Sequence, residues 1–185
     1  RQRKAVNRAF RPTRLCGMEP MIHEVADNLL EPIKQKQQME FVGEFAVWLP
    51  MTIIAYALGV GTSDLDKFKK WSDDLVMPVG NPDPNVEKVR DYLISLKDFN
   101  EFFGDLLRQR RESPEEDIIS DVATAEVNDQ MLNQAEMLSM LQQFLVAGNE
   151  TTTKLLTNLM YRLAVDENLE NLLRDNPKLI DNFIE

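Results

Sequence analysis

One long helical pattern with an unusual centre constrains the fold of this chain more than any other feature. The pattern begins with a capping box, in which the Asn133 side chain and the Glu136 side chain each bond the other residue's backbone, and it continues to about Val165. At 1.5 Å per residue, about thirty residues make a rod of roughly 50 Å, which is longer than most helices of globular proteins. The sequence therefore predicts a single helix that crosses the whole domain.

The centre of this helix reads Ala-Gly-Asn-Glu-Thr-Thr over residues 147–152. Glycine costs about 1 kcal/mol relative to alanine in a helix interior. Ala147 and Gly148 leave room for a flat prosthetic group to approach the backbone, and the Thr151 hydroxyl can bond the Ala147 carbonyl and so open or bend the helix. Glu150 can pass protons from water to this point. The alternative interpretation is a close contact between two helices through small residues.

The rest of the chain predicts helices with very little else. Gly59 is expected to end one of them, and three prolines between Met77 and Pro84 predict a loop. No alternating strand pattern is present, so the predicted fold class is all-α, with residues 1–185 as one helical segment of a larger domain. The segments with a helical period are residues 1–10, 18–36, 42–58, 65–76, 85–111, 117–125 and 133–165, and a last helix begins at residue 176.

Composition excludes several classes of protein. The formal net charge of −10 argues against nonspecific binding to nucleic acid. A single cysteine cannot form an internal disulfide and fits a reducing, cytoplasmic compartment. The most apolar stretch, residues 45–60, is shorter than the roughly 20 residues of a membrane span. Because the chain starts inside one helical pattern without an initiating Met and ends inside another, we expect it to be an internal piece of a longer protein.

The turn at residues 147–152 resembles the oxygen-binding turn of the cytochrome P450 family, the haem-thiolate monooxygenases, which has the pattern A-G-x-[D/E]-T-T. Nearly the whole chain can be aligned with the middle of a soluble bacterial member. The resemblance implies the helical part of the cytochrome P450 fold and a haem (iron protoporphyrin IX) cofactor. Further matches occur, in the family's order, at residues 8–12, 19–20, 40–60 and 117–126.

The resemblance also implies roles for residues near the haem. Glu150 and Thr151 are the expected catalytic pair, which delivers protons to reduced dioxygen. Ala147, Gly148 and Thr151 are expected to lie against the haem, with Ala147 and Gly148 leaving space for dioxygen. Arg3 falls on the arginine of the family's His-x-x-x-Arg pattern and is expected to hold a haem propionate, because its planar guanidinium matches a carboxylate.

Candidate substrate contacts come from two segments. Gln143, Val146 and Ala147 lie one or two turns before the catalytic pair, on the face that touches substrate in the family. Leu75 and Met77 lie in a segment that resembles the movable lid of family members. Ordinary core packing remains the alternative for Leu75 and Met77, and exposure to water remains the alternative for Gln143.

The iron ligand of the family is not found in this chain. It is the cysteine of a Phe-x-x-Gly-x-x-x-Cys-x-Gly loop, and Cys16 does not match because Phe10 precedes it by six positions and Thr13 stands where Gly is required. We expect Cys16 to be a buried small apolar residue and His23 to be a surface residue. The axial cysteine is thus expected outside this segment, and the isolated segment is expected to be inactive.

The expected activity is insertion of one oxygen atom from dioxygen into an apolar organic substrate, with electrons from a ferredoxin-type donor. Two alternatives remain: a non-enzymatic all-α interaction or ligand-binding domain, and a helical haem or lipid binder without the thiolate. The donor is expected on a basic N-terminal face, although the same residues also fit a solvated helix surface. These basic residues are Arg1, Lys4, Arg8, Arg11 and Arg14.

Overall fold

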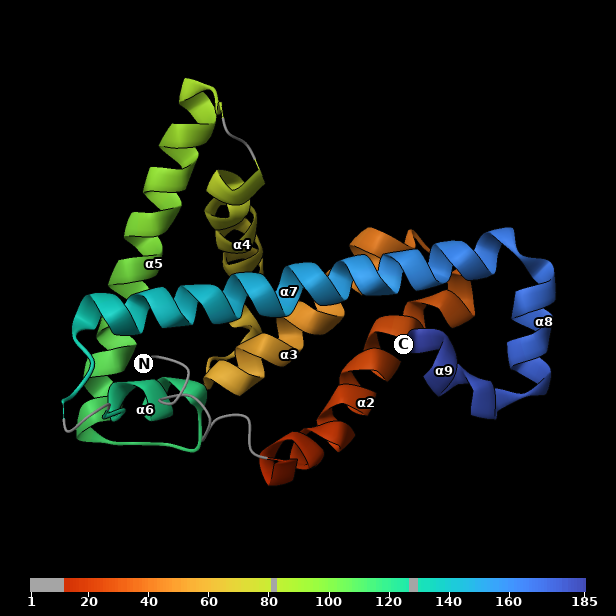
Figure 1. Ribbon diagram of the computed structural model, residues 1–185, viewed down its shortest axis with the longest axis horizontal. Coiled ribbons are helices and arrows are strands. Elements are labelled where there is room, and N and C mark those ends of the chain that lie inside the picture. The colour runs from red at the N-terminus through yellow and green to blue at the C-terminus, as the bar shows by residue number, and fades with distance from the viewer. Residues whose placement is uncertain (1–11, 81–82, 127–129) are drawn as a thin grey trace.

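The computed structural model describes residues 12–80, 83–126 and 130–185, and these residues fold almost entirely into helices (Figure 1). Within them there is no strand, and only an isolated bridge pairs Glu126 with Met131. The all-α prediction is therefore confirmed. The elements are α2 (Pro12–Lys36), the π-helical turn η1 (Val42–Ala46), α3 (Trp48–Leu58), the 3-10 turn η2 (Thr62–Asp64), α4 (Leu65–Gly80), α5 (Val86–Glu112), α6 (Ile118–Ala123), α7 (Gln134–Val165), α8 (Glu167–Asp175), the 3-10 turn η3 (Pro177–Leu179) and α9 (Ile180–Ile184).

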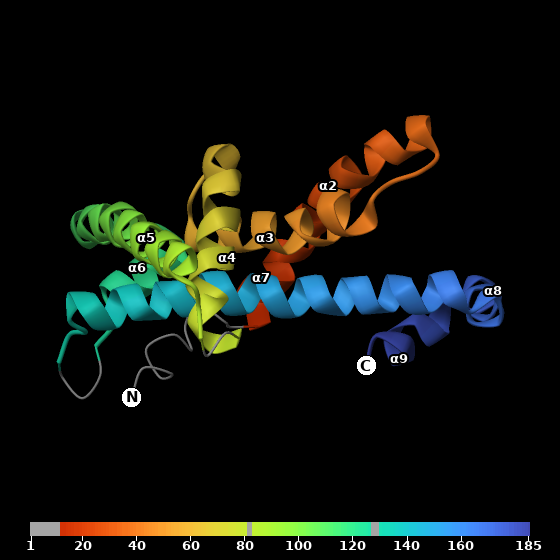
Figure 2. The ribbon, with the colours of Figure 1, turned by 90° about the horizontal axis from the view of Figure 1, so that it is seen from above.

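Helix α7 is the long axis around which the other helices are arranged. The Asn133 side chain accepts a hydrogen bond from the Glu136 backbone at 2.9 Å, and the Glu136 carboxylate accepts one from the Asn133 backbone at 3.0 Å. The predicted capping box and the predicted length are both confirmed, since the helix runs for 32 residues. Figures 1 and 2 show a nearly straight rod. In Figure 1, α4 and α5 project from one side of it, α2 and α3 lie on the other, and α8 and α9 fold back at its C-terminal end.

The core lies where α4 and α5 cross the N-terminal half of α7. Its centre is Trp71, which is 1% exposed and which contacts three phenylalanine rings of α5 at centroid distances between 5.4 and 6.0 Å. Full burial of each such ring contributes roughly 1.5–3 kcal/mol. This packing fixes α4 and α5 as an antiparallel pair against α7. The rings of the cluster are Phe68, Trp71, Phe99, Phe102 and Phe103.

Two predicted helix boundaries differ by several residues from the structure, and each difference involves proline. The predicted loop at residues 77–84 is wrong at its start, because α4 continues through Pro78 to Gly80. A proline in the last turn removes one backbone hydrogen bond but leaves the preceding turns intact. Helix α2 begins at Pro12 and not at residue 18, and contains Pro20 and Pro32. The helix predicted for residues 1–10 lies outside the described residues.

The predicted helix at residues 42–58 is divided into η1 and α3. Pro50 has no N–H to bond the Ala46 carbonyl, as the fifth residue of an ordinary helical turn would. The backbone before it widens into a π-helical turn, in which the Val47 N–H bonds the Val42 carbonyl at 3.0 Å. The division is therefore a local consequence of one proline.

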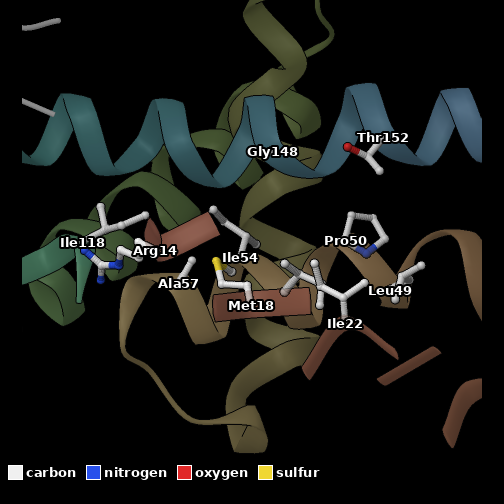
Figure 3. A pocket seen from close by; sticks show the side chains of 11 residues that line it. Arg14, Met18, Ile22, Leu49, Pro50, Ile54, Ala57, Ile118, Gly148 and Thr152 are labelled. Atoms are coloured by element: carbon white, nitrogen blue, oxygen red, sulfur yellow. The ribbon is translucent and has the colours of Figure 1, made fainter. Parts of the chain in front are cut away.

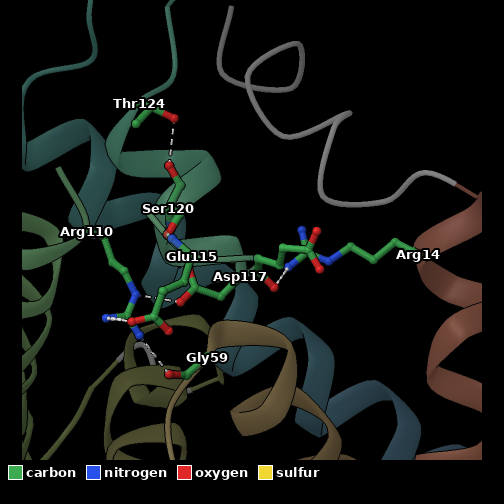
Figure 4. Close-up of polar contacts among 8 residues, drawn as sticks. Arg14, Gly59, Arg110, Glu115, Asp117, Ser120 and Thr124 are labelled. Atoms are coloured by element: carbon green, nitrogen blue, oxygen red, sulfur yellow. Dashed lines mark hydrogen bonds and ion pairs between the residues drawn. The ribbon is translucent and has the colours of Figure 1, made fainter. Parts of the chain in front are cut away.

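Gly59 ends α3 as predicted, and a polar cluster explains why no other residue fits there. Its φ of 83° is left-handed, and a Cβ at this position would overlap the Asp117 carboxylate. Asp117 caps α6 by accepting from Ser120 N at 2.6 Å and accepts from Arg110 Nε at 2.6 Å. Arg110 Nη2 donates to the Gly59 carbonyl at 3.3 Å and Nη1 lies 2.8 Å from Glu115 (Figure 4). The cluster joins the ends of α3, α5 and α6.

No helix in the described ranges is both long enough and apolar enough to cross a membrane.

Candidate functional site

The structure places three of the predicted residues of α7 on one exposed stripe. Gln143, Ala147 and Thr151 follow one another at four-residue spacing, which places them in a line on one helix face. All three are exposed, while Val146 beside them is half-buried and packs against the core. The stripe therefore presents two small side chains and one amide at the centre of α7.

The predicted hydrogen bond of Thr151 is present, but the predicted opening of the helix is not. Thr151 Oγ1 donates to the Ala147 carbonyl at 2.7 Å. The α-helix nevertheless continues without interruption through this turn. A carbonyl oxygen has two lone pairs, so it can accept from a hydroxyl without losing its backbone partner. Thr157 bonds the Thr153 carbonyl in the same way at 2.8 Å, which shows that this bond alone does not break α7.

Glu150 stands next to the stripe and has a partner that sequence reasoning overlooked. Its carboxylate lies 3.1 Å from the Lys154 ammonium, with exposed side-chain fractions of 26% and 73%. A Glu followed by a Lys four residues later on a helix is a recognisable signal for such a pair. The arrangement places a carboxylate one residue from an exposed hydroxyl, at the edge of water. Such a pair can take up a proton and pass it on.

Gly148 does not share the face of Ala147, which is a correction to the predicted site. A Cβ at Gly148 would lie 3.3 Å from Ile54 Cδ1 of α3. Gly148 and Thr152 instead form the roof of a cavity of about 320 Å³ between α2, α3 and α7 (Figure 3). Close helix packing, the alternative interpretation, explains the glycine. The other lining residues are Arg14, Met18, Ile22, Leu49, Pro50, Ile53, Ile54, Ala57 and Ile118.

The two substrate candidates on α4 have different environments. Leu75 is 4% exposed and belongs to the core cluster, so ordinary packing, the alternative given above, describes it. Met77 is half-buried. Neither residue lines the cavity of Figure 3. Met77 is thus the one that remains available for a substrate contact.

Of the predicted basic face, only Arg14 belongs to the described residues. Its Nη1 donates to Asp121 Oδ2 at 2.7 Å and its Nη2 donates to the Glu116 carbonyl at 2.8 Å. Arg14 therefore binds α2 to the region of α6, and the prediction that it serves an acidic partner is not supported. Arg3, the propionate candidate, lies outside the described residues, as do Arg1, Lys4, Arg8 and Arg11.

Cys16 is exposed, so the prediction that it is a buried apolar residue is wrong. The neighbouring residue Gly17 is exposed as well, because no described element packs on this side of α2. His23 is a surface residue as predicted, with its side chain 75% exposed and its Nε2 4.0 Å from Glu19. In the described residues no three His, Cys, Asp or Glu side chains converge as metal ligands would.

Sequence reasoning also missed Asn149, which occupies the unspecified position of the turn. It is 2% exposed, and its Nδ2 donates to Ser72 Oγ of α4 at 3.2 Å. A polar residue at the centre of a long helix, with a threonine four residues later, is the available signal. The amide points to the core side of α7, away from the exposed stripe.

The fold and the stripe together define a class: all-α domains in which one long central helix presents small and hydroxyl-bearing residues on an exposed stripe. The family model described as Cytochrome P450 matches residues 1–178. The chain therefore belongs to the cytochrome P450 family, whose members bind haem.

Relatives and solved structures agree with this assignment. The putative cytochrome P450 YjiB of Bacillus subtilis (strain 168) is 33% identical, over 99% of this chain and 47% of that protein. The vitamin D(3) 25-hydroxylase of Pseudonocardia autotrophica is 31% identical, over 100% of this chain and 44% of the relative. P450BioI, solved with hexadec-9Z-enoic acid ligated acyl carrier protein, superposes with a TM-score of 0.91 at 27% identity, covering 100% of this chain and 47% of that one. The chain spans about half the length of the curated relatives it matches.

Proposed function

We propose that the protein containing this chain is a haem-dependent monooxygenase that inserts one oxygen atom from dioxygen into an apolar organic substrate. The exposed stripe on α7 carries the proposal, because Ala147 and Thr151 are aligned on it and Glu150 stands beside it. Bound haem supplies the chemistry that activates dioxygen. The residues of this chain supply the surface beside it and the protons.

The stripe fits a flat group. Ala147 and Thr151 are short, exposed and one turn apart, and a planar ring system can therefore approach the backbone between them. Gln143, one turn earlier, is long enough to touch a substrate above such a group. Arg3 remains the proposed partner of a haem propionate. Gly148 is left out, because a Cβ at this position would meet Ile54 of α3.

The proposed proton path runs from water through Glu150 to Thr151. The Glu150 carboxylate is partly exposed, so it can take a proton from solvent, while Lys154 holds it at the edge of the stripe. The Thr151 hydroxyl donates to Ala147 at rest and can instead turn its proton outward while its oxygen accepts the next one. A positioned acid of this kind typically accelerates a proton-dependent step by about 10²–10⁴.

The proposed substrate wall consists of Gln143, Val146 and Ala147 on α7 and Met77 on α4. An apolar substrate is supported by similar proteins: one relative is named a vitamin D(3) 25-hydroxylase, and CYP267B1, 32% identical to this chain, was solved with myristic acid. We further propose a ferredoxin-type electron donor that binds the basic residues of the first eleven positions, in the cytoplasm. Its rate of electron transfer should then fall as ionic strength rises.

The test compares two neighbouring threonines in the full-length enzyme. Thr151→Ala should divert most electrons to hydrogen peroxide, because the proton carrier on the stripe is lost. Thr152→Ala is the matched control, since Thr152 lies at the cavity on the α3 side. Product and peroxide are measured per NAD(P)H oxidised. Equal coupling in Thr151→Ala and wild type would refute the assigned role of Thr151.

A further inference from the structure

A chain of three polar side chains, of which Ser72 and Asn149 are buried and Thr153 is half-buried, crosses the core side of α7 behind the exposed stripe. Ser72 of α4 is 0% exposed and Asn149 of α7 is 2% exposed, with 3.2 Å between Ser72 Oγ and Asn149 Nδ2. Thr153, one turn further on α7, lies 3.3 Å from Asn149 Oδ1 and 3.1 Å from the Ala46 carbonyl of η1. The chain thus connects three separate elements, α4, α7 and η1.

The hydrogen bond from the Thr153 hydroxyl to the Ala46 carbonyl, at one end of this chain, satisfies a buried acceptor. The Ala46 carbonyl has no helical N–H partner at Pro50, and it is buried. An unpaired buried carbonyl costs free energy comparable to a lost hydrogen bond. The Thr153 hydroxyl satisfies it from the neighbouring helix. Thr153 therefore has a fixed proton acceptor, which in turn determines the hydrogen bonding of Asn149.

The number of available protons determines how Asn149 connects Ser72 with Thr153. Thr153 has a single hydroxyl proton, and both Ala46 O and Asn149 Oδ1 lie within its reach. If the Asn149 amide is turned over, Ser72 donates to its oxygen, its nitrogen donates to Thr153, and Thr153 donates to Ala46, so that each of these protons has one acceptor. With the amide turned over, Asn149 therefore bridges Ser72 and Thr153. Among the described residues no buried side-chain nitrogen or oxygen lacks a hydrogen-bond partner.

The consequence concerns the position of α4 relative to α7. Apolar contacts such as those of Trp71 and Leu75 are nondirectional and tolerate sliding, whereas a buried hydrogen bond fixes one separation and one register. Ser72 precedes the proposed substrate contact Met77 by about one and a half turns. Asn149 lies two residues from both Ala147 and Thr151. The Ser72–Asn149 hydrogen bond therefore holds α4 and α7, the two walls of the proposed substrate site, at one distance.

We propose that Asn149 is a positioning residue. Through its bond to Ser72 it sets the separation of α4 and α7 and thereby the width of the substrate site. This proposal rests on the proposed function. The α4–α5 pair is tied together independently, because Ser95 of α5 donates to Asp74 of α4. Loss of the Ser72–Asn149 bond leaves that pair intact and lets it shift as a unit against the spine.

The experiment uses the full-length holoprotein and two iron-binding probes. Imidazole reports only on the iron, whereas 4-phenylimidazole also needs room between the walls, so the ratio of their dissociation constants, read from haem absorbance, isolates the width of the site. Ser72→Ala and Asn149→Ala should each raise the dissociation constant of 4-phenylimidazole about fivefold relative to that of imidazole. This is the size expected when one hydrogen bond is lost. The double variant should show no further change.

The matched control is Ser95→Ala, which also removes a buried serine hydroxyl bound to α4 but does not touch α7. Its probe ratio should equal that of the wild type even if its thermal stability falls as far as that of Ser72→Ala. Equal ratios in Ser72→Ala and Ser95→Ala would overturn the positioning role. If Asn149→Ala does not take up haem, Ser72→Ala alone tests the proposal, because this variant keeps the larger Asn149 side chain and loses only the serine hydroxyl.

The reduced carbon monoxide complex of the wild type separates the two hypotheses. A main absorption band at the position of thiolate-bound haem, together with an unmoved probe ratio in Ser72→Ala, overturns the role of Asn149 and leaves the monooxygenase proposal intact. A wild type without that band overturns both.

Discussion

Removal of the Arg110 side chain should destabilise the protein more than removal of any exposed arginine. Arg110 is 11% exposed and Asp117 is 4% exposed at the side chain, and their contact is 2.6 Å. In Arg110→Ala, Oδ2 of Asp117 would lose this partner while Oδ1 keeps its bond to Ser120 N. Breaking a buried ion pair from one side costs about 3–5 kcal/mol, because a buried charge is left uncompensated.

The assay is urea unfolding of the full-length protein. At a slope of about 3 kcal/mol per molar urea, the midpoint in Arg110→Ala should fall by about 1–1.7 M. In an Asp117→Asn background the further loss should be smaller, because no charge is then stranded. The control is Arg108→Ala, whose ion pair with Asp105 has side chains 72% and 63% exposed and contributes about 0–1 kcal/mol. Equal midpoint shifts for Arg108→Ala and Arg110→Ala would refute the reasoning.

The remaining predictions concern stability. Gly59→Ala should lower the free energy of unfolding by about 1–2 kcal/mol or more, because its φ is 83° and a Cβ meets the Asp117 carboxylate. Gly17→Ala lies in an open part of a helix and should raise it by up to about 1 kcal/mol. A higher melting temperature for Gly59→Ala than for Gly17→Ala would contradict this. Lys67→Met should lose about 0.5–1 kcal/mol in the same assay, since its ammonium lies 4.8 and 4.9 Å from two aromatic rings. A hydrogen bond to Asp74 raises the pKa of Lys70 above 10.5, so its contribution is complete below that pH and is lost as pH rises through the higher folded value. Asp74→Asn should flatten the alkaline loss of stability, and an unchanged slope would count against the pair.

Local sequence signals predicted those parts of the structure whose cause is local. The capping box of Asn133, the length of α7 and the stop at Gly59 all depend on residues within a turn or two. The hydrogen bond from Thr151 to Ala147 follows from the same short range. Each of these was correct because residues close by in the sequence are enough to indicate it.

Features that depend on a partner far along the chain could not be predicted in this way. Gly148 is small because Ile54 of α3 lies against it, and Arg14 is engaged because α6 lies beside it. Asn149 is buried because Ser72, 77 positions earlier, meets its amide. Nothing in the neighbouring sequence specifies these contacts, since they arise only when the helices pack.

The family resemblance predicted that Ala147, Gly148 and Thr151 share one site, and helix periodicity alone could not separate their faces. Both the stripe with Ala147 and the face with Gly148 contain small residues, and only packing distinguishes them. The structure buries the second face against α3 and leaves the first exposed. The candidate site is therefore narrower than the sequence motif suggests.

A crystal structure of the full-length protein with its haem tests the central claim most directly. The account requires the haem to lie against the stripe of Ala147 and Thr151, with Glu150 at its edge. A haem that instead occupies the α3 side of the spine, beneath Gly148 and Thr152, would contradict it.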